Sequence, residues 1–126
     1  MQRRVWERRA AALVSDEVVS LSSSNGFRIA FEPDRECITL HVVGEIDIVT
    51  AGDMEDPLLD LLDRGFETVV LDLREVTFLD SSGLRVLINS QRYAQERGAH
   101  LSILVGTSRS RDVLELSGVI DHLDIS

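Results

Sequence analysis

The order of apolar and polar positions divides this chain of 126 residues into two parts. In residues 1–24, apolar residues recur at helical spacing with arginine and glutamate between them, which predicts an amphipathic helix ending before the serine-rich stretch at 22–26. The apolar positions that define this helix are Trp6, Ala10, Leu13, Val14 and Val18. From Phe27 the period changes to two, the repeat of a half-buried β-strand. We therefore expect an N-terminal extension over 1–24 and one folded domain over 27–126.

The domain is expected to begin with a β-hairpin. Alternating apolar residues predict strands at 27–31 and 38–42, and the Pro33-Asp34-Arg35-Glu36 stretch between them has the residue types of a turn. Cys37 lies in the second strand pattern, so we expect its side chain to be buried.

Helices and strands alternate over the rest of the domain. Thr50 is a suitable N-cap for a helix that ends near Gly65, and Pro57 is expected to kink this helix or to mark a short first turn. The remaining expected elements are a strand at 68–73, a helix at 84–97, a strand at 101–105, a short helix through 113–116 and a last short strand within 119–125. This alternation after a hairpin predicts an α/β fold with one mixed sheet of four to five strands, in which the later strands are parallel.

A strand-to-helix turn, Phe78-Leu79-Asp80-Ser81-Ser82-Gly83-Leu84, carries two hydroxyls and a carboxylate. A serine where a helix begins can accept hydrogen bonds from the free N–H groups of the first turn. The same N–H groups and the helix dipole also favour an anion. The turn by itself leaves open whether Ser81 is an N-cap, a nucleophile or a phosphate acceptor.

Composition argues against catalysis at this turn. The chain has no lysine among its thirteen basic residues, which excludes a P-loop lysine, a kinase lysine and Schiff-base chemistry. The turn lacks a G-x-S-x-G elbow, and the three histidines lie in or beside strand patterns away from it. These are His41, His100 and His122. Three scattered histidines and one cysteine also lack the spacing of metal ligands, so we expect no catalytic residue, metal or cofactor.

Charge and hydropathy limit the partners and the location. The net charge of −9 and the pI near 4.7 argue against a nucleic-acid partner. No apolar run approaches the length of a membrane span, so we expect no membrane partner, and the N-terminus lacks the apolar segment of a signal peptide. A single cysteine cannot close an intrachain disulfide, which fits a reducing compartment. We expect a cytoplasmic protein.

One segment of the domain is strongly acidic. Between residues 45 and 63 there are seven acidic residues and no basic one, namely Glu45, Asp47, Asp53, Glu55, Asp56, Asp60 and Asp63. These residues form either a solvated helix face or a binding surface for a basic partner.

Three stretches of the domain together resemble the signatures of the STAS-domain anti-sigma-factor antagonists, the bacterial anti-anti-sigma proteins. They are Val43-Gly44-Glu45-Ile46-Asp47 with Thr50-Ala51, the turn at 78–84, and Leu116-Ser117-Gly118-Val119. The resemblance covers residues 27–126 and implies a single STAS-like domain with helices packed mainly on one face of its sheet. Members of this family usually continue past the last strand into a C-terminal helix. This sequence stops at Ser126, so either the helix is missing or the chain is cut before it.

The resemblance also implies a partner switch. In this family the serine directly after the aspartate, here Ser81, is phosphorylated by an anti-sigma factor that is itself a serine kinase. The unphosphorylated antagonist binds the anti-sigma factor and frees the sigma factor; phosphorylation releases the antagonist, and a separate phosphatase resets it. The implied switch surface consists of Glu45, Asp47, Thr50, Asp80, Ser82, Gly83 and Leu84.

The alternative hypothesis is a STAS interaction module without phosphorylation, such as a transporter-associated subunit or a scaffold in a stress-sensing assembly. Such a module would bind its partner constitutively and would respond little to Ser81→Ala. The acidic segment is compatible with both hypotheses, and the sequence leaves self-association open. An intact Asp80-Ser81 pair favours the phosphorylated antagonist, since a scaffold has no need of an acceptor hydroxyl.

Overall fold

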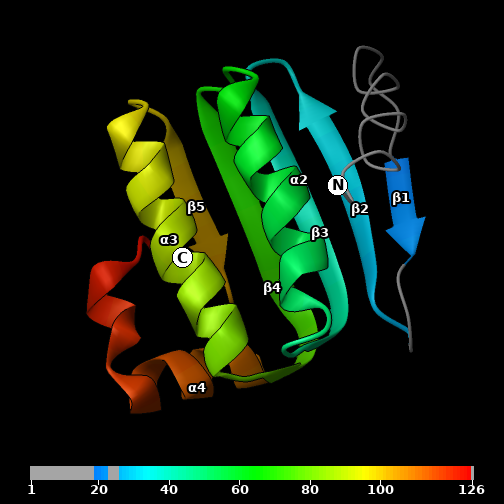
Figure 1. Ribbon diagram of the computed structural model, residues 1–126, viewed down its shortest axis with the longest axis vertical. Coiled ribbons are helices and arrows are strands. Elements are labelled where there is room, and N and C mark those ends of the chain that lie inside the picture. The colour runs from blue at the N-terminus through cyan, green and yellow to red at the C-terminus, as the bar shows by residue number, and fades with distance from the viewer. Residues whose placement is uncertain (1–18, 23–25, 126) are drawn as a thin grey trace.

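The computed structural model of the chain describes residues 19–22 and 26–125. In chain order, its elements are β1 (Val19–Ser22), β2 (Arg28–Asp34), β3 (Cys37–Ile46), α2 (Ala51–Asp63), β4 (Thr68–Leu79), α3 (Ser81–Glu96), β5 (His100–Leu104), α4 (Arg109–Ser117) and the 3-10 helix η2 (Val119–His122). The five strands form one sheet in sequence order, and α2 and α3 lie side by side over one face of it (Figure 1).

The sheet is mixed, as the alternation of elements predicts. Strands β1, β2 and β3 pair antiparallel, whereas β3, β4 and β5 pair parallel. Parallel neighbours need a crossover connection, and α2 and α3 supply the two crossovers. The expected α/β fold, with an early hairpin, later parallel strands and helices on one face, is confirmed.

The core lies between the sheet and the two helices. Along β3, Ile38, Leu40 and Val42 are at most 1% exposed, and the residues between them point to the other face of the sheet. Residues from the neighbouring elements complete this core, among them Phe31, Met54, Leu58, Leu61, Leu71, Leu87, Leu101 and Ile103. Burial of this apolar surface is the main force that holds the two helices against the sheet.

The N-terminal edge of the sheet differs from the expectation. The predicted helix would have reached the serine-rich stretch, but Val19–Ser22 form a strand that pairs antiparallel with residues 28–31 of β2. The free edge of β2 offers unpaired N–H and C=O groups, and pairing with them satisfies the backbone of this segment. Residues 1–18 of the predicted helix lie outside the described part of the chain.

The C-terminal segment also differs from the expectation of a last strand within 119–125. Its first residues form η2, and the segment meets the sheet only through a single parallel bridge between Ile103 and Ile125. Gly118, with φ of +77°, ends α4 in a left-handed conformation and turns the chain directly into η2.

Two single-residue expectations need correction. Helix α2 runs without interruption through Pro57, which is buried in its middle and does not mark a first turn. The apolar stripe of this helix is fully buried, which offsets the roughly 3 kcal/mol cost of an internal proline. Cys37 is exposed, because it begins β3 beside the hairpin turn and the alternation places Ile38 rather than Cys37 toward the helices.

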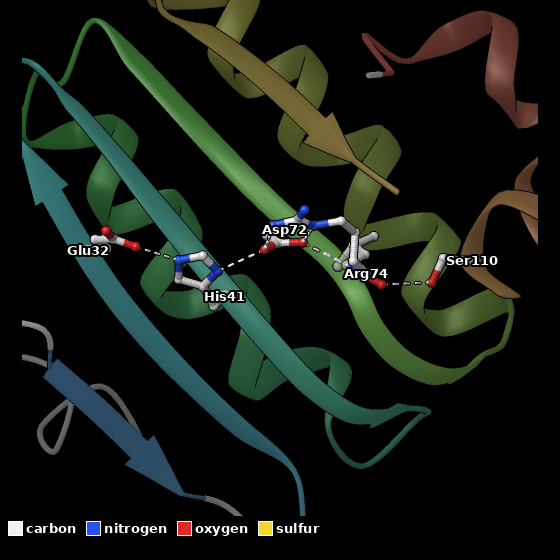
Figure 2. A network of polar contacts seen from close by, with 6 residues as sticks. Glu32, His41, Asp72, Arg74 and Ser110 are labelled. Atoms are coloured by element: carbon white, nitrogen blue, oxygen red, sulfur yellow. Dashed lines mark hydrogen bonds and ion pairs between the residues drawn. The ribbon is translucent and has the colours of Figure 1, made fainter. Parts of the chain in front are cut away.

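A polar network crosses the sheet on the face away from α2 and α3. The two ring nitrogens of His41 contact Asp72 Oδ2 and Glu32 Oε1, each at 2.8 Å (Figure 2). Arg74 donates from its backbone N–H and from Nε to Asp72 Oδ1, at 3.0 Å in both cases. Asp72 is only 6% exposed, so its carboxylate depends on these partners. The network joins β2, β3 and β4 independently of their backbone ladders.

This network makes stability depend on pH. Burial alone lowers the pKa of His41, but hydrogen bonds to Glu32 and Asp72 outweigh it and raise this pKa above its ordinary value of 6.5. The stabilisation is therefore complete below about pH 6.5 and is lost as the pH rises through the raised value. The loss is about 1.4 kcal/mol for each unit of pKa elevation. Urea unfolding between pH 6 and 9 should show the free energy of unfolding decline with pH in wild type, and decline less in His41→Gln. Equal declines in the two proteins would contradict this prediction.

Candidate functional site

The turn at 78–84 lies at the carboxyl edge of the parallel strands, where β4 ends and α3 begins. The backbone N–H of Asp80 donates to the carbonyl of Ile46 at 3.1 Å, and Glu45 and Ile46 pair with Phe78 and Leu79. The end of β3 and the loop that follows it therefore lie directly beside the turn. The fold thus brings together the predicted residues of the first two of the three signature stretches: Glu45, Asp47 and Thr50 with Asp80, Ser81, Ser82, Gly83 and Leu84.

Asp80 is the N-cap of α3. Its backbone is extended, and its Oδ1 accepts hydrogen bonds from the N–H groups of Ser82 at 2.8 Å and Gly83 at 3.4 Å. These are two of the donors that the first turn of a helix leaves free. The capping role that the sequence left open for Ser81 thus belongs to the aspartate before it.

Ser81 is the first residue of α3, and its side chain is exposed. Within the described part of the chain, its hydroxyl makes no hydrogen bond. Ser82, by contrast, is partly buried. Of the two hydroxyls in the turn, the Ser81 hydroxyl is therefore the one that solvent, or a second protein, reaches more easily.

The loop between β3 and α2 is fixed by hydrogen bonds around Asp47. Its Oδ1 accepts from the N–H groups of Val49 at 2.9 Å and Thr50 at 3.1 Å. The Thr50 hydroxyl accepts from the N–H of Asp47 at 2.9 Å and donates to the carbonyl of Glu45 at 2.7 Å. Thr50 is thus at the N-cap position, but its side chain stabilises the loop and does not cap α2.

The electrostatic consequence is a fixed negative charge beside the turn. The N–H groups of Thr50 and Val49 donate to the Asp47 carboxylate and hold its pKa below the ordinary value of 3.8. Asp47 is therefore ionised at neutral pH. A partner that docks here meets a carboxylate whose position the loop already determines.

Gly83 allows α3 to approach the ends of β3 and β4. A Cβ added at this position would lie 2.3 Å from Leu79 Cδ1 and 2.8 Å from Ile46 Cγ2. Both neighbours are buried, so neither has free space into which to move. Leu84, the next residue, packs partly buried against the core. Gly83 and Leu84 thus set the position of the turn, while Ser81 remains on the surface.

Three exposed apolar residues at this site were not predicted from the sequence. Ile48 is 81% exposed and Val49 67% exposed in the Asp47–Thr50 loop, and Phe78 is 48% exposed at the end of β4. Two adjacent apolar residues between Asp47 and Thr50, in a turn that is otherwise polar, were a usable signal for the first two. Exposed apolar side chains with acidic neighbours are typical of a protein interaction surface.

A shallow groove of about 160 Å³ extends this surface toward α4. It is lined by Thr77, Phe78, Leu79, Arg109, Asp112 and Val113. Helix α4 is held against β4 by the buried Ser110, whose hydroxyl donates to the carbonyl of Leu73 at 3.4 Å. The apolar wall of the groove is continuous in sequence with the Ser81 turn.

The described residues contain no group of histidine, cysteine and carboxylate side chains arranged to hold a metal ion. His41 pairs with Asp72 and His100 pairs with Asp124 of the C-terminal segment, and neither histidine contacts Ser81. No helix among the described residues has the length and apolar character needed to cross a membrane. The turn thus presents an accessible hydroxyl together with exposed apolar side chains and carboxylates.

Comparison with known proteins assigns the family. The family model described as "Mlab, STAS domain" matches residues 29–123, which include every strand from β3 onward and the Ser81 turn. The chain therefore belongs to the STAS domain family.

The chain is also similar to proteins that are named anti-sigma factor antagonists. The anti-sigma-B factor antagonist of Bacillus subtilis is 27% identical over 89 residues, which cover 71% of this chain and 81% of the relative. An anti-sigma factor antagonist from Mycobacterium paratuberculosis has a TM-score of 0.72 at 24% identity, covering 83% of this chain and 89% of the other. The Bacillus cell fate determinant SpoIIAA in its phosphorylated form has a TM-score of 0.60 at 19% identity, covering 78% and 90%. The two structures share the fold of this chain.

Proposed function

We propose that this protein is an anti-sigma-factor antagonist that is switched by phosphorylation of Ser81. The unphosphorylated form binds an anti-sigma factor with serine kinase activity and so frees a sigma factor. Phosphorylation of Ser81 ends this binding, and a phosphatase restores it. The protein acts in the cytoplasm, where these partners work, and its own part is regulatory binding rather than catalysis. Membership of the STAS family and the name of the Bacillus subtilis relative support this proposal.

The observation that carries the proposal is that Asp80, and not Ser81, caps α3. Asp80 accepts the hydrogen bonds that begin α3, so the exposed Ser81 hydroxyl is not needed for the fold. A phosphoacceptor must be free of structural hydrogen bonds and accessible to a kinase, and Ser81 has both properties. Ser82, one residue away, is less exposed.

The proposed binding surface surrounds this hydroxyl. It consists of Glu45, Asp47, Ile48, Val49, Thr50, Phe78, Asp80, Ser82, Gly83 and Leu84. The exposed apolar side chains supply surface to be buried, and the carboxylates suit a partner with basic residues at the edge of its interface. Thr50, Gly83 and Leu84 contribute by fixing the loop and the turn rather than by contact.

The test is intact-mass analysis after incubation with ATP and the serine kinases of the source organism. Wild type should gain one phosphate and Ser81→Ala none, while Ser82→Ala, the matched control one residue away, should be modified like wild type. The expected result would assign both the switch and its residue. If kinases that still modify their own antagonists leave the wild-type mass unchanged, the proposal fails, and the protein is a constitutive binding module.

A further inference from the structure

Arg85 stands one helical turn after Ser81 on α3 and is exposed. It makes no hydrogen bond or ion pair with any residue that the structure describes. Residues four apart lie on the same face of a helix, and side chains lean toward its N-terminus. This spacing places the guanidinium of Arg85 within reach of the turn that carries Ser81.

The other charged side chains near Ser81 are not available to pair with a phosphate in the way that Arg85 is. Asp80 and Asp47 are carboxylates whose oxygens already accept backbone hydrogen bonds. Arg109 belongs to α4 and lines the groove beside Phe78. Arg85 is the arginine that α3 places one turn from Ser81, and in the described part of the chain no carboxylate pairs with it.

We propose that Arg85 pairs with the phosphate of phosphorylated Ser81 and holds it against the first turn of α3. This inference rests on the proposed function in that it takes Ser81 as the acceptor. A guanidinium offers parallel N–H donors that match two phosphate oxygens, and an acidic group four residues before a basic one is the favourable order on a helix. The pair offsets part of the repulsion between the phosphate and the Asp80 carboxylate.

The test uses the full chain with phosphoserine installed at position 81 during synthesis, followed by ³¹P NMR over a pH titration. Removing the guanidinium should make the phosphate dianion less favourable, so Arg85→Gln should reduce the second acid dissociation constant of the phosphate about threefold. Arg85→Lys should keep most of the wild-type value, because it keeps the charge. Arg92→Gln, an exposed arginine farther along α3, is the matched control and should leave the titration unchanged.

The inference is overturned if Arg85→Gln titrates like wild type, or if Arg92→Gln shifts the phosphate by the same amount. Because the phosphoserine is installed without a kinase, the result is independent of the proposed switch. If the phosphate titrates as expected but no serine kinase modifies the protein, the Arg85 pair is supported and the phosphorylation switch is refuted. If a kinase phosphorylates Ser81 but Arg85→Gln leaves the phosphate titration unchanged, the switch is supported and the pair is refuted.

Discussion

Phosphorylation of Ser81 should weaken binding of the anti-sigma factor about a thousandfold, which corresponds to about 4 kcal/mol. A phosphate adds nearly two negative charges at the centre of a surface that already holds Asp47 and Asp80. In the complex these charges must also be removed from water, and a buried like-charge contact costs far more than an exposed one. Most of the loss of binding free energy therefore arises at the interface.

The stability of the free protein should scarcely change when Ser81 is phosphorylated. The N-terminus of α3 stabilises the phosphate by about 1–2 kcal/mol. Asp80, at about 6 Å, repels it by about 3 kcal/mol for each pair of charges at an effective dielectric near 20, and solvent and salt at this exposed turn reduce that repulsion. These opposing terms are similar in size, so the free energy of unfolding should change by only about 1 kcal/mol.

Isothermal titration calorimetry with both forms, and urea unfolding of each, would measure the two effects separately. Ser81→Ala should bind as tightly as the unphosphorylated wild type and should not respond to the kinase. Equal affinities for the two forms would contradict the switch. A large loss of stability on phosphorylation would mean that unfolding, rather than the interface, ends the binding.

Gly83→Ala should destabilise the protein by about 1–3 kcal/mol, although alanine is the better helix former. Propensity alone predicts a gain of up to about 1 kcal/mol for this change within a helix. The new Cβ, however, would lie 2.3 Å from Leu79 Cδ1 and 2.8 Å from Ile46 Cγ2, so α3 or the strand ends must move. The turn moves with α3, and partner binding should weaken together with stability.

Gly52→Ala is the matched control. Gly52 lies in α2, and an added Cβ there would have no neighbour within 4 Å. This variant should be more stable than wild type by about 0.4–1 kcal/mol, since alanine reduces the freedom of the unfolded chain. Urea unfolding of both variants provides the comparison. A stabilising Gly83→Ala would show that the helix relaxes away from the strands at no cost, and that Gly83 does not fix the turn.

Much of the fold could be predicted because its signals are local. The period of two over 27–42 predicted the hairpin, and Gly65 and Gly98 marked the ends of α2 and α3, where both adopt positive φ. Strand–helix alternation then left a mixed sheet with parallel later strands as the expected arrangement. These are properties of neighbouring residues, which the sequence displays directly.

The wrong expectations arose where a distant segment decided the outcome. Val19–Ser22 became a strand because β2 offers a free edge, which no residue near position 20 reveals. Pro57 remains inside α2 because burial of the helix against the sheet outweighs the cost of the missing hydrogen bond. The exposure of Ile48 and Val49 likewise depends on the loop that Asp47 and Thr50 hold in place.

The sequence by itself determined the class of fold and the stretch that carries the proposed site, since periodicity, turn residues and the Asp80-Ser81-Ser82-Gly83 turn are readable along the chain. Only the tertiary structure decided which of these residues does what. It assigned the cap to Asp80, left the Ser81 hydroxyl exposed, and brought the Asp47 loop beside the turn. The reason is physical: a serine, an aspartate and a free helix end allow several hydrogen-bonding arrangements, and the packing of α3 against the strand ends selects one.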